Sequence, residues 1–444
     1  MSLTLKFLFY SFPAFIFFGS GFINFYIFFF TIYSFFFFYY NKIRININKL
    51  DYLIILFFLA STISSLLNFN EIRNFNVGGK AFILEISDFT KSIFNFRFFF
   101  LYIIVRNIID KQLVNIKVLS VISLICTVLL SLDIFLQHLT GLDIFNNPPF
   151  DGRYNGFFEH EAIAGGYIQK FFLISIICLF ILKKKPLNQF LKIIVFINIL
   201  GFGILLSLDR MPYLIFFFSN IILLITLKNY RIQLLISLTL TIFLFQIIFN
   251  NYNIVKNRYL SLAGELELVK ITKMFKNSFS KSFIFSNNIN ISSNNINKND
   301  DNLKGDYLKI YYAAFHVFLD KPFFGTGLKS FLDECKKLQN NNNKNFTCST
   351  HTHNIYLEIL VNQGVIGLLL FLLFIVILIN NNYSNIIFSQ LTSKKKIVSI
   401  FFFTILLSEL IPFRSYGNIY GTASGTIFWF FLGLISCNLK SKNI

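Results

Sequence analysis

The chain has 444 residues, of which 55% are hydrophobic, 19% are aromatic and only 14% are charged. No ordinary soluble core needs so many apolar residues, so the composition excludes a soluble globular protein. The formal net charge of +19 does not indicate a nucleic-acid partner, because the Lys and Arg residues fall mostly in short loops between apolar segments, the pattern that orients membrane proteins.

Apolar windows of roughly 18–25 residues, enough to cross about 30 Å of hydrocarbon as a helix, follow one another along the chain. They predict an all-α polytopic membrane protein with about twelve transmembrane helices. The predicted spans are 5–20, 22–40, 51–68, 92–108, 118–138, 165–182, 190–208, 213–228, 232–250, 355–380, 397–412 and 419–438. Only Gly19-Ser20-Gly21 separates the first two, so eleven spans is the alternative.

These spans divide the chain into residues 1–250 with helices one to nine, a long loop at 251–354, and residues 355–444 with helices ten to twelve. Every second connection is basic, including 183–185 and 394–396, whereas the intervening loops mix positive and negative residues. The positive-inside rule therefore predicts both termini in the cytoplasm and the long loop outside.

The long loop contains three predicted parts. A stretch at 262–285 is amphipathic and suits a helix lying on the membrane surface. The Asn-rich segment 286–302 is typical of low-complexity sequence without packed structure. Two short helices are predicted at 307–319 and 328–338, with a turn at 321–327 between them.

Two of the five cysteines, Cys335 and Cys348, lie together in this loop, whereas the other three fall in predicted spans. An oxidising exterior favours a disulfide between them, and closing so short a loop contributes about 3 kcal/mol in the chain-entropy model. Two free thiols are the alternative. A zinc site with the nearby histidines lacks paired-ligand spacing, so no metal is expected.

A group of short motifs carries a resemblance to a known family. His353-Asn354 is followed, after nine residues, by Gly364-Val365-Ile366-Gly367, which resembles the signature of the O-antigen ligase and O-antigen polymerase superfamily. The turn at 322–327 is similar to that family's P-x-x-G-x-G turn, and 153–157 to its R-x-x-G-x-F segment. Arg210 stands where the family has an arginine at the outer end of the seventh span. The resemblance covers about 140–370 by motif and the flanking spans only by topology.

The resemblance implies a multi-pass enzyme of the bacterial inner membrane, with its active face in the periplasm. Such an enzyme transfers a glycan from a polyprenyl-diphosphate donor to an acceptor hydroxyl, inverting the sugar and using no metal or other cofactor. The acceptor stays open among a lipid A-core sugar, which makes the chain a ligase, a growing glycan, which makes it a polymerase, and a protein Ser or Thr. Besides these substrates, the expected partners are membrane lipids.

The implied chemistry needs a base near neutrality and cations for a leaving diphosphate. His353 is the predicted base, because it holds the family spacing to the glycine pair, and His351 is expected to assist or orient it. The residues expected to bind the diphosphate are Arg210, Arg153 and Lys309. Asn354 is expected to hold the acceptor or cap the helix that starts there, and Gly364 and Gly367 to let that helix pack closely against its neighbours.

One position departs from the family pattern. Where the family commonly has an arginine before the P-x-x-G-x-G proline, this chain has Tyr307, with Lys309 nearby. Lysine meets a phosphate as a point charge and lacks the bidentate fork of arginine. Arg97, inside a predicted span, and Arg414, after the eleventh, are further cationic candidates. Glu161 is a candidate for binding sugar hydroxyls.

Plainer interpretations stand beside these roles. A histidine at a helix start is often only a solvated loop residue, and Arg210 could simply reach toward the headgroups. A twelve-span transporter or lipid flippase is a rival class, and a structural or receptor protein is a third. Against a transporter stand the absence of a visible two-fold repeat and the expected absence of ionisable pairs within the membrane.

Overall fold

The computed structural model describes residues 1–68, 88–159, 161, 163–181, 186–252, 255–256, 259, 306–342, 346–387, 393–412, 414 and 418–437. Within these ranges the chain is helical, with one isolated bridge between Phe150 and Arg153. The predicted segments 262–285 and 286–302 lie outside the described residues.

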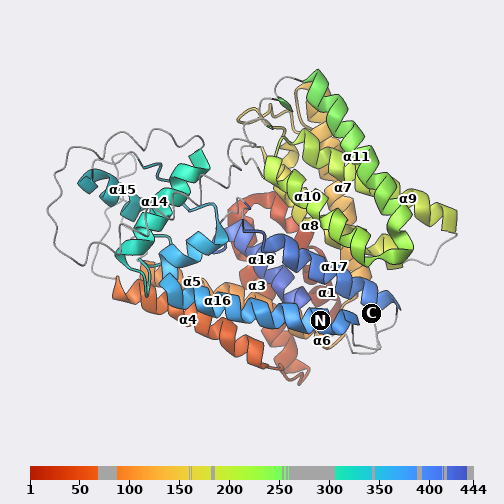
Figure 1. The fold of residues 1–444 in the computed structure, drawn as a ribbon. Coiled ribbons are helices and arrows are strands. Elements are labelled where there is room, and N and C mark those ends of the chain that lie inside the picture. The colour runs from red at the N-terminus through yellow and green to blue at the C-terminus, as the bar shows by residue number, and fades with distance from the viewer. Residues whose placement is uncertain are drawn as a thin grey trace.

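The helices follow one another in the order expected from the apolar windows (Figure 1). The first half contains α1 Ser2–Tyr10, α2 Phe12–Phe15, η1 Ile16–Phe18, α3 Gly19–Tyr40, α4 Lys49–Leu67, α5 Asp88–Phe94, α6 Phe96–Asp110, α7 Ile116–Thr140, η2 Gly156–Phe158 and α8 Ala164–Ile181. The second half contains α9 Pro186–Leu206, α10 Arg210–Thr226, η3 Lys228–Tyr230, α11 Arg231–Asn251, α14 Asp306–Asp320, α15 Phe331–Asn342, α16 Ile355–Ile387, α17 Ser393–Glu409 and α18 Thr422–Ile435.

By length and composition, eight helices in the described residues suit a membrane crossing, and α10 and α18 are shorter apolar helices. The chain is therefore an all-α polytopic membrane protein, while the count of twelve spans stays a prediction. The first two predicted spans form an antiparallel pair. The Tyr33 hydroxyl donates to the Met1 carbonyl at 2.9 Å and the Tyr26 hydroxyl to the Leu8 carbonyl at 2.6 Å. The backbone reverses at Gly19, whose φ of 80° is open to glycine.

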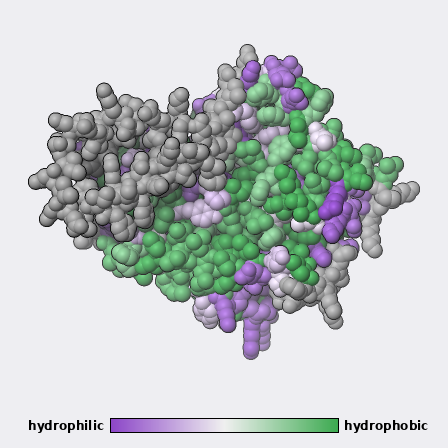
Figure 2. All heavy atoms as spheres, viewed as in Figure 1, coloured by the Kyte–Doolittle hydropathy of each residue, from purple (hydrophilic) through white to green (hydrophobic). Residues whose placement is uncertain are grey.

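Helix α18 lies in the middle of the bundle, with every residue from Gly425 to Ile435 buried. The Trp429 ring packs against Phe57, Phe58 and Phe374 from α4 and α16, with ring centroids 4.8–6.4 Å apart. The outer surface is also apolar: Figure 2 shows a largely hydrophobic face, and large apolar side chains on α3, α7 and α11 are exposed. A helix bundle that is apolar both inside and outside is suited to lipid rather than water.

Helices α14 and α15 stand apart from the bundle at the left of Figure 1, where the two short loop helices are predicted. They enclose a small core that includes Ala313, Val317, Phe331 and Phe346, and Val361 of α16 completes it. A disulfide joins Cys335 to Cys348, as the sequence predicts, and ties α15 to the segment that leads into the histidines.

The bundle has two chemically different ends. The end of α8 and the connection after α10 meet at one end, where the Tyr230 hydroxyl donates to the Phe180 carbonyl at 3.2 Å. A buried ion pair, Arg106 to Asp51 at 2.7 Å, joins the start of α4 to the end of α6. The two partners lie in different helices, at the ends of these apolar segments, so the expected absence of ionisable pairs within the membrane stays a prediction.

Candidate active site

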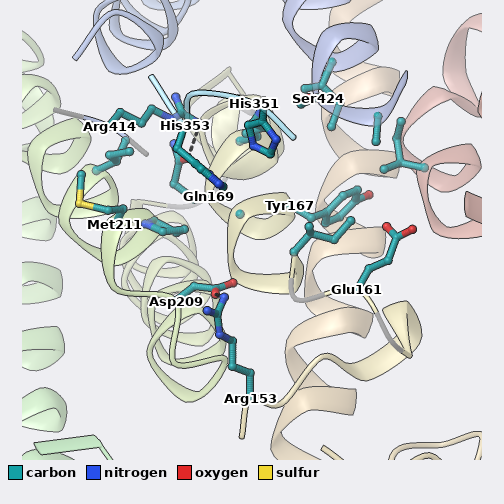
Figure 3. Close-up of a pocket in the computed structure, with 18 of the residues that line it drawn as sticks. Arg153, Glu161, Tyr167, Gln169, Asp209, Met211, His351, His353, Arg414 and Ser424 are labelled. Carbon is teal, nitrogen blue, oxygen red and sulfur yellow. Dashed lines mark hydrogen bonds and ion pairs between the residues drawn. The ribbon is translucent and has the colours of Figure 1, made fainter. Parts of the chain in front are cut away.

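A cavity of about 490 Å³ lies where several helices begin, at the opposite end of the bundle from the Arg106–Asp51 pair. Helices α8, α10 and α18 contribute their first turns, and the segments before α16 and after α17 complete the wall. The polar lining residues are Arg153, Glu161, Tyr167, Gln169, Lys170, Asp209, Tyr307, His351, His353, Arg414 and Ser424 (Figure 3). The apolar wall includes Ile16, Ile163, Ile215 and Ile427.

The two imidazoles form a close pair on the cavity wall. The ring centroids of His351 and His353 are 4.0 Å apart, and the Tyr307 ring meets His353 edge-on at 5.2 Å. Hydroxyl groups lie at both rings: Ser349 Oγ is 3.3 Å from His353 Nε2, and Thr350 Oγ1 is 3.1 Å from His351 Nδ1. Tyr307, the residue that replaces the family arginine, is thus a direct neighbour of the predicted base.

The start of α16 holds this pair in an unusual backbone conformation. His353 has a φ of 55°, in the left-handed region that few side chains occupy. The Asn354 side chain caps the helix, accepting from the backbone N–H groups of Tyr356 at 3.0 Å and Leu357 at 3.2 Å. Its amide also donates to the Pro412 carbonyl at 2.5 Å, which ties the cap to the segment that carries Arg414.

The glycine motifs form one structural unit beneath the histidines. Helix α16 breaks at Gly364, where φ is 65° and ψ is −162°. The 321–327 turn fits into this break: the Thr326 N–H donates to the Val361 carbonyl and the Val365 N–H to the Pro322 carbonyl, both at 2.8 Å. A Cβ at Gly364 would lie 2.3 Å from the Phe323 carbonyl oxygen. Gly364 therefore permits close packing, as predicted, and it does so against the turn.

Three cations line the cavity, namely Arg153, Arg414 and Lys170. Arg153 meets Asp209 at 3.1 Å, at the lower end of the view in Figure 3. Near the histidines, Arg414 pairs with Glu409 at 3.0 Å and donates to Gln169 Oε1 at 3.0 Å. The third cation, Lys170, interacts electrostatically with that second pair. The cavity therefore has positive charge at both ends.

Comparison with known families decides the class. The O-antigen ligase family model matches residues 193–372, which contain α10, the loop helices, the histidine pair and most of α16. This match supports membership of the chain in the O-antigen ligase/polymerase superfamily. It also supports, in general, a membrane glycosyltransferase of the O-antigen ligase type. No curated protein matches the chain.

Burial sets the ionisation of this ligase-type site. Burial and the neighbouring His351 lower the pKa of His353 to about 4, so its imidazole is neutral at pH 7. The pKa of His351 is also lowered by burial, against which the nearby Glu358 acts. Burial raises the pKa of Asp209 to about 6, although Arg153 opposes the change. The sequence suggested an ordinary histidine pKa, and the apolar surroundings explain the difference.

The predicted site residues do not all reach the cavity of the O-antigen ligase-type protein. His351, His353 and Arg153 line it, and Asn354 caps the helix beside it. Arg210 begins α10 between the lining residues Asp209 and Met211 but does not line the cavity, and Lys309 does not line it either.

Three lining residues deserved more weight at the sequence level. Lys170 lies in a predicted span, where an ionisable residue is itself a sign of function. Arg414 was one of the further cationic candidates, and Asp209 was not predicted to belong to the site. Lys170 and Arg414 lie outside the segment matched by the family model, so only the fold brings them to the histidines. Arg97 does not line the cavity and lies over the Phe98 ring.

Proposed function

We propose that this protein transfers a glycan from a polyprenyl-diphosphate donor to an acceptor hydroxyl, on the periplasmic face of the inner membrane. The observation that carries the proposal is the convergence of two neutral imidazoles and three cations on one cavity. Their segments lie far apart in the chain and share one end of the bundle, opposite the Arg106–Asp51 pair. This arrangement suits a substrate with a charged head and an apolar tail.

The donor's diphosphate is placed among the cavity cations. Arg153, Lys170 and Arg414 supply the positive charge that a leaving diphosphate needs, without requiring a metal. The isoleucines of the cavity wall, among them Ile215 and Ile427, offer an apolar path for the first isoprene units. The predicted contacts of Arg210 and Lys309 with the diphosphate stay predictions.

The histidine pair supplies the base in this proposal. The acceptor oxygen attacks the anomeric carbon from the side opposite the diphosphate, and the bond between that carbon and the phosphate oxygen breaks. The hydroxyl proton passes to His353, and the diphosphate leaves with the bonding electron pair, so the sugar configuration inverts. A bound diphosphate raises the basicity of His353, because negative charge nearby favours the protonated imidazole.

Replacing His353 tests this assignment. His353→Ala is expected to abolish glycan transfer and leave the amount of protein in the membrane unchanged, because a general base contributes about 10²–10⁴-fold. His353→Asn is the stricter variant, since asparagine tolerates the left-handed backbone at this position better than most residues. The matched control is His138→Ala, in a histidine that does not line the cavity. Retained transfer in both His353 variants would refute the assignment.

The acceptor is identified by a gene deletion followed by gel analysis of surface glycans. Loss of all polymer from the lipid A-core indicates a ligase, whereas attachment of single repeats indicates a polymerase. If both patterns stay normal and glycoproteins lose their glycan, the acceptor is a protein hydroxyl. A deletion without any glycan change would instead favour a transporter or receptor role. Glycan transfer by the purified protein from a lipid-linked donor would exclude that role.

A further inference from the structure

Glu358 is a buried carboxylate directly behind the histidine pair. It lies in the first turn of α16 and is only 3% exposed. Thr352, the residue between the two histidines, donates to Glu358 Oε2 from its backbone N–H at 2.9 Å. Its hydroxyl shares one proton between Glu358 Oε2 at 3.0 Å and the Asn354 carbonyl oxygen at 2.9 Å. The Asn362 amide donates to Glu358 Oε1 at 3.2 Å. The carboxylate therefore fixes the backbone that joins the two imidazoles.

The charge on Glu358 is not needed for these hydrogen bonds. A glutamine could accept both Thr352 bonds through its oxygen and donate its amide to Asn362 after that side chain turns over. Asn362 Oδ1 is buried without a hydrogen-bond partner, so it is available for such a bond. Burying a carboxylate costs more than burying an amide, although the positive end of the α16 dipole offsets part of this cost. The hydrogen bonds alone therefore do not explain why a negatively charged side chain is buried at this position.

The groups around Glu358 indicate what its negative charge does. The donors to its carboxylate are neutral, and no ion pair within 4 Å engages it in the described ranges. The ionisable groups that its charge influences include His351 and Lys329. When the histidine pair takes a proton, a positive charge appears beside His351, within the field of Glu358. A carboxylate behind a catalytic histidine stabilises such a charge and orients the ring.

We propose that Glu358 is the positioning residue of the histidine pair: it fixes the two rings through Thr352, and its negative charge stabilises the proton that they accept. The inference rests on the proposed function, because it takes His353 as the base. Glu358 acts through its neighbours and is not itself placed against the substrate.

Other ionisable groups line the cavity together with the histidine pair. They are Tyr307 from α14, whose ring meets His353, Lys170 from α8, Asp209 before α10, Arg414 after α17, and Arg153 and Glu161 before α8. All of them are retained when Glu358 alone is changed, so a difference between wild type and variant reports the carboxylate.

The experiment measures the histidines directly. Full-length protein in lipid nanodiscs is treated with diethylpyrocarbonate, which modifies neutral imidazole, and the modified peptide containing both histidines is quantified by mass spectrometry over a range of pH. In Glu358→Gln we expect the midpoint of modification to fall by about one pH unit, because a negative charge that favours the protonated ring is lost. The matched control is Glu334→Gln, in a carboxylate of α15 that does not line the cavity, and it should leave the midpoint unchanged.

Glu358→Asp separates position from charge. It keeps the charge but shortens the reach to Thr352, so the histidine midpoint should stay close to that of wild type. Transfer of glycan from a polyprenyl-diphosphate donor, extracted from a strain that lacks this gene, should fall about 10- to 100-fold, because small misplacements of a catalytic group are costly. This variant also keeps the test open if Glu358→Gln does not accumulate in the membrane.

The outcomes distinguish the inference from the proposed function. An unchanged histidine midpoint in Glu358→Gln, or wild-type transfer in Glu358→Asp, overturns the role of Glu358 even when His353→Asn is inactive. Conversely, if His353→Asn still transfers glycan, the proposed base is wrong, while a lowered midpoint in Glu358→Gln still supports a carboxylate that controls the histidine pair.

Discussion

His353 combines a strained backbone with a half-buried ring, and both features follow from its position between two tightly bound residues. Thr352 on one side is held by Glu358, and Asn354 on the other caps α16 and bonds to the Pro412 carbonyl. Held at both ends, the residue keeps a left-handed φ of 55°, which costs of order 1–3 kcal/mol and persists only where the surroundings determine it. The strain therefore keeps the ring directed into the cavity.

The buried imidazole predicts the pH dependence of transfer. Because the pKa of His353 lies near 4, the neutral ring persists as the pH falls through 6.5, the ordinary histidine value. We expect kcat/KM, which reports the free enzyme, to lose its base only well below pH 6. Asp209, whose pKa is about 6, adds a second titration, so the profile is measured with the Asp209→Asn variant beside wild type. A limb centred at 6.5 in both proteins would contradict the prediction.

At the scale of elements, the site depends on a break within helix α16. The break in α16 at Gly364 exposes backbone groups that the 321–327 turn satisfies. The end of α4 holds the same joint, because the Ser64 hydroxyl donates to the Asn362 carbonyl at 2.6 Å and the Leu328 N–H donates to Ser65 Oγ at 3.0 Å. Irregular backbone inside a membrane protein is tolerated where other segments bury and satisfy it.

Alanine substitutions test this joint. Gly364→Ala and Gly325→Ala each place a Cβ at a positive φ and within 2.3–2.5 Å of backbone atoms of the facing segment. We expect each to destabilise the fold by about 2–5 kcal/mol, from strain and overpacking together. Gly21→Ala is the control, because a Cβ there meets nothing within 4 Å. The measurement is the melting temperature in detergent, and equal values for all three variants would show that the joint is loose.

At the scale of the whole molecule, the fold separates a reactive end from a basic end. The cavity is formed where α8, α10, α16 and α18 begin and where α17 ends, while the Arg106–Asp51 pair, with Lys49 and Lys111 at the same helix ends, lies at the other end. Because successive helices run in opposite directions, their connections fall alternately at the reactive end and at the basic end. It also agrees with a topology in which the cavity faces outward, as the distribution of Lys and Arg predicts.

Cysteine labelling in intact cells measures that orientation. Asp320→Cys, at the end of α14, is expected to react with a membrane-impermeant maleimide, whereas Ile47→Cys, in the connection before α4, should react only after the cells are permeabilised. Both positions are exposed, and the three free cysteines of the described residues are buried. Labelling of Ile47→Cys alone in intact cells would reverse the predicted topology and place the cavity in the cytoplasm.

The sequence by itself determined the class of fold, because long uncharged windows have few alternatives to membrane helices. Its resemblance to a known family located the histidine pair and the glycine turn, and the spacing of two cysteines in the outer loop predicted the disulfide. It could not rank the cations. Lys170 and Arg414 are far from the histidines along the chain, whereas Arg210 stood within a motif yet lines no part of the cavity. Which charges meet is decided by how helices pack, and packing depends on contacts between distant segments. For the same reason the sequence does not predict the role of Glu358. A single carboxylate in an apolar helix forms no sequence motif, and its bonds to Thr352 become visible only in the folded structure.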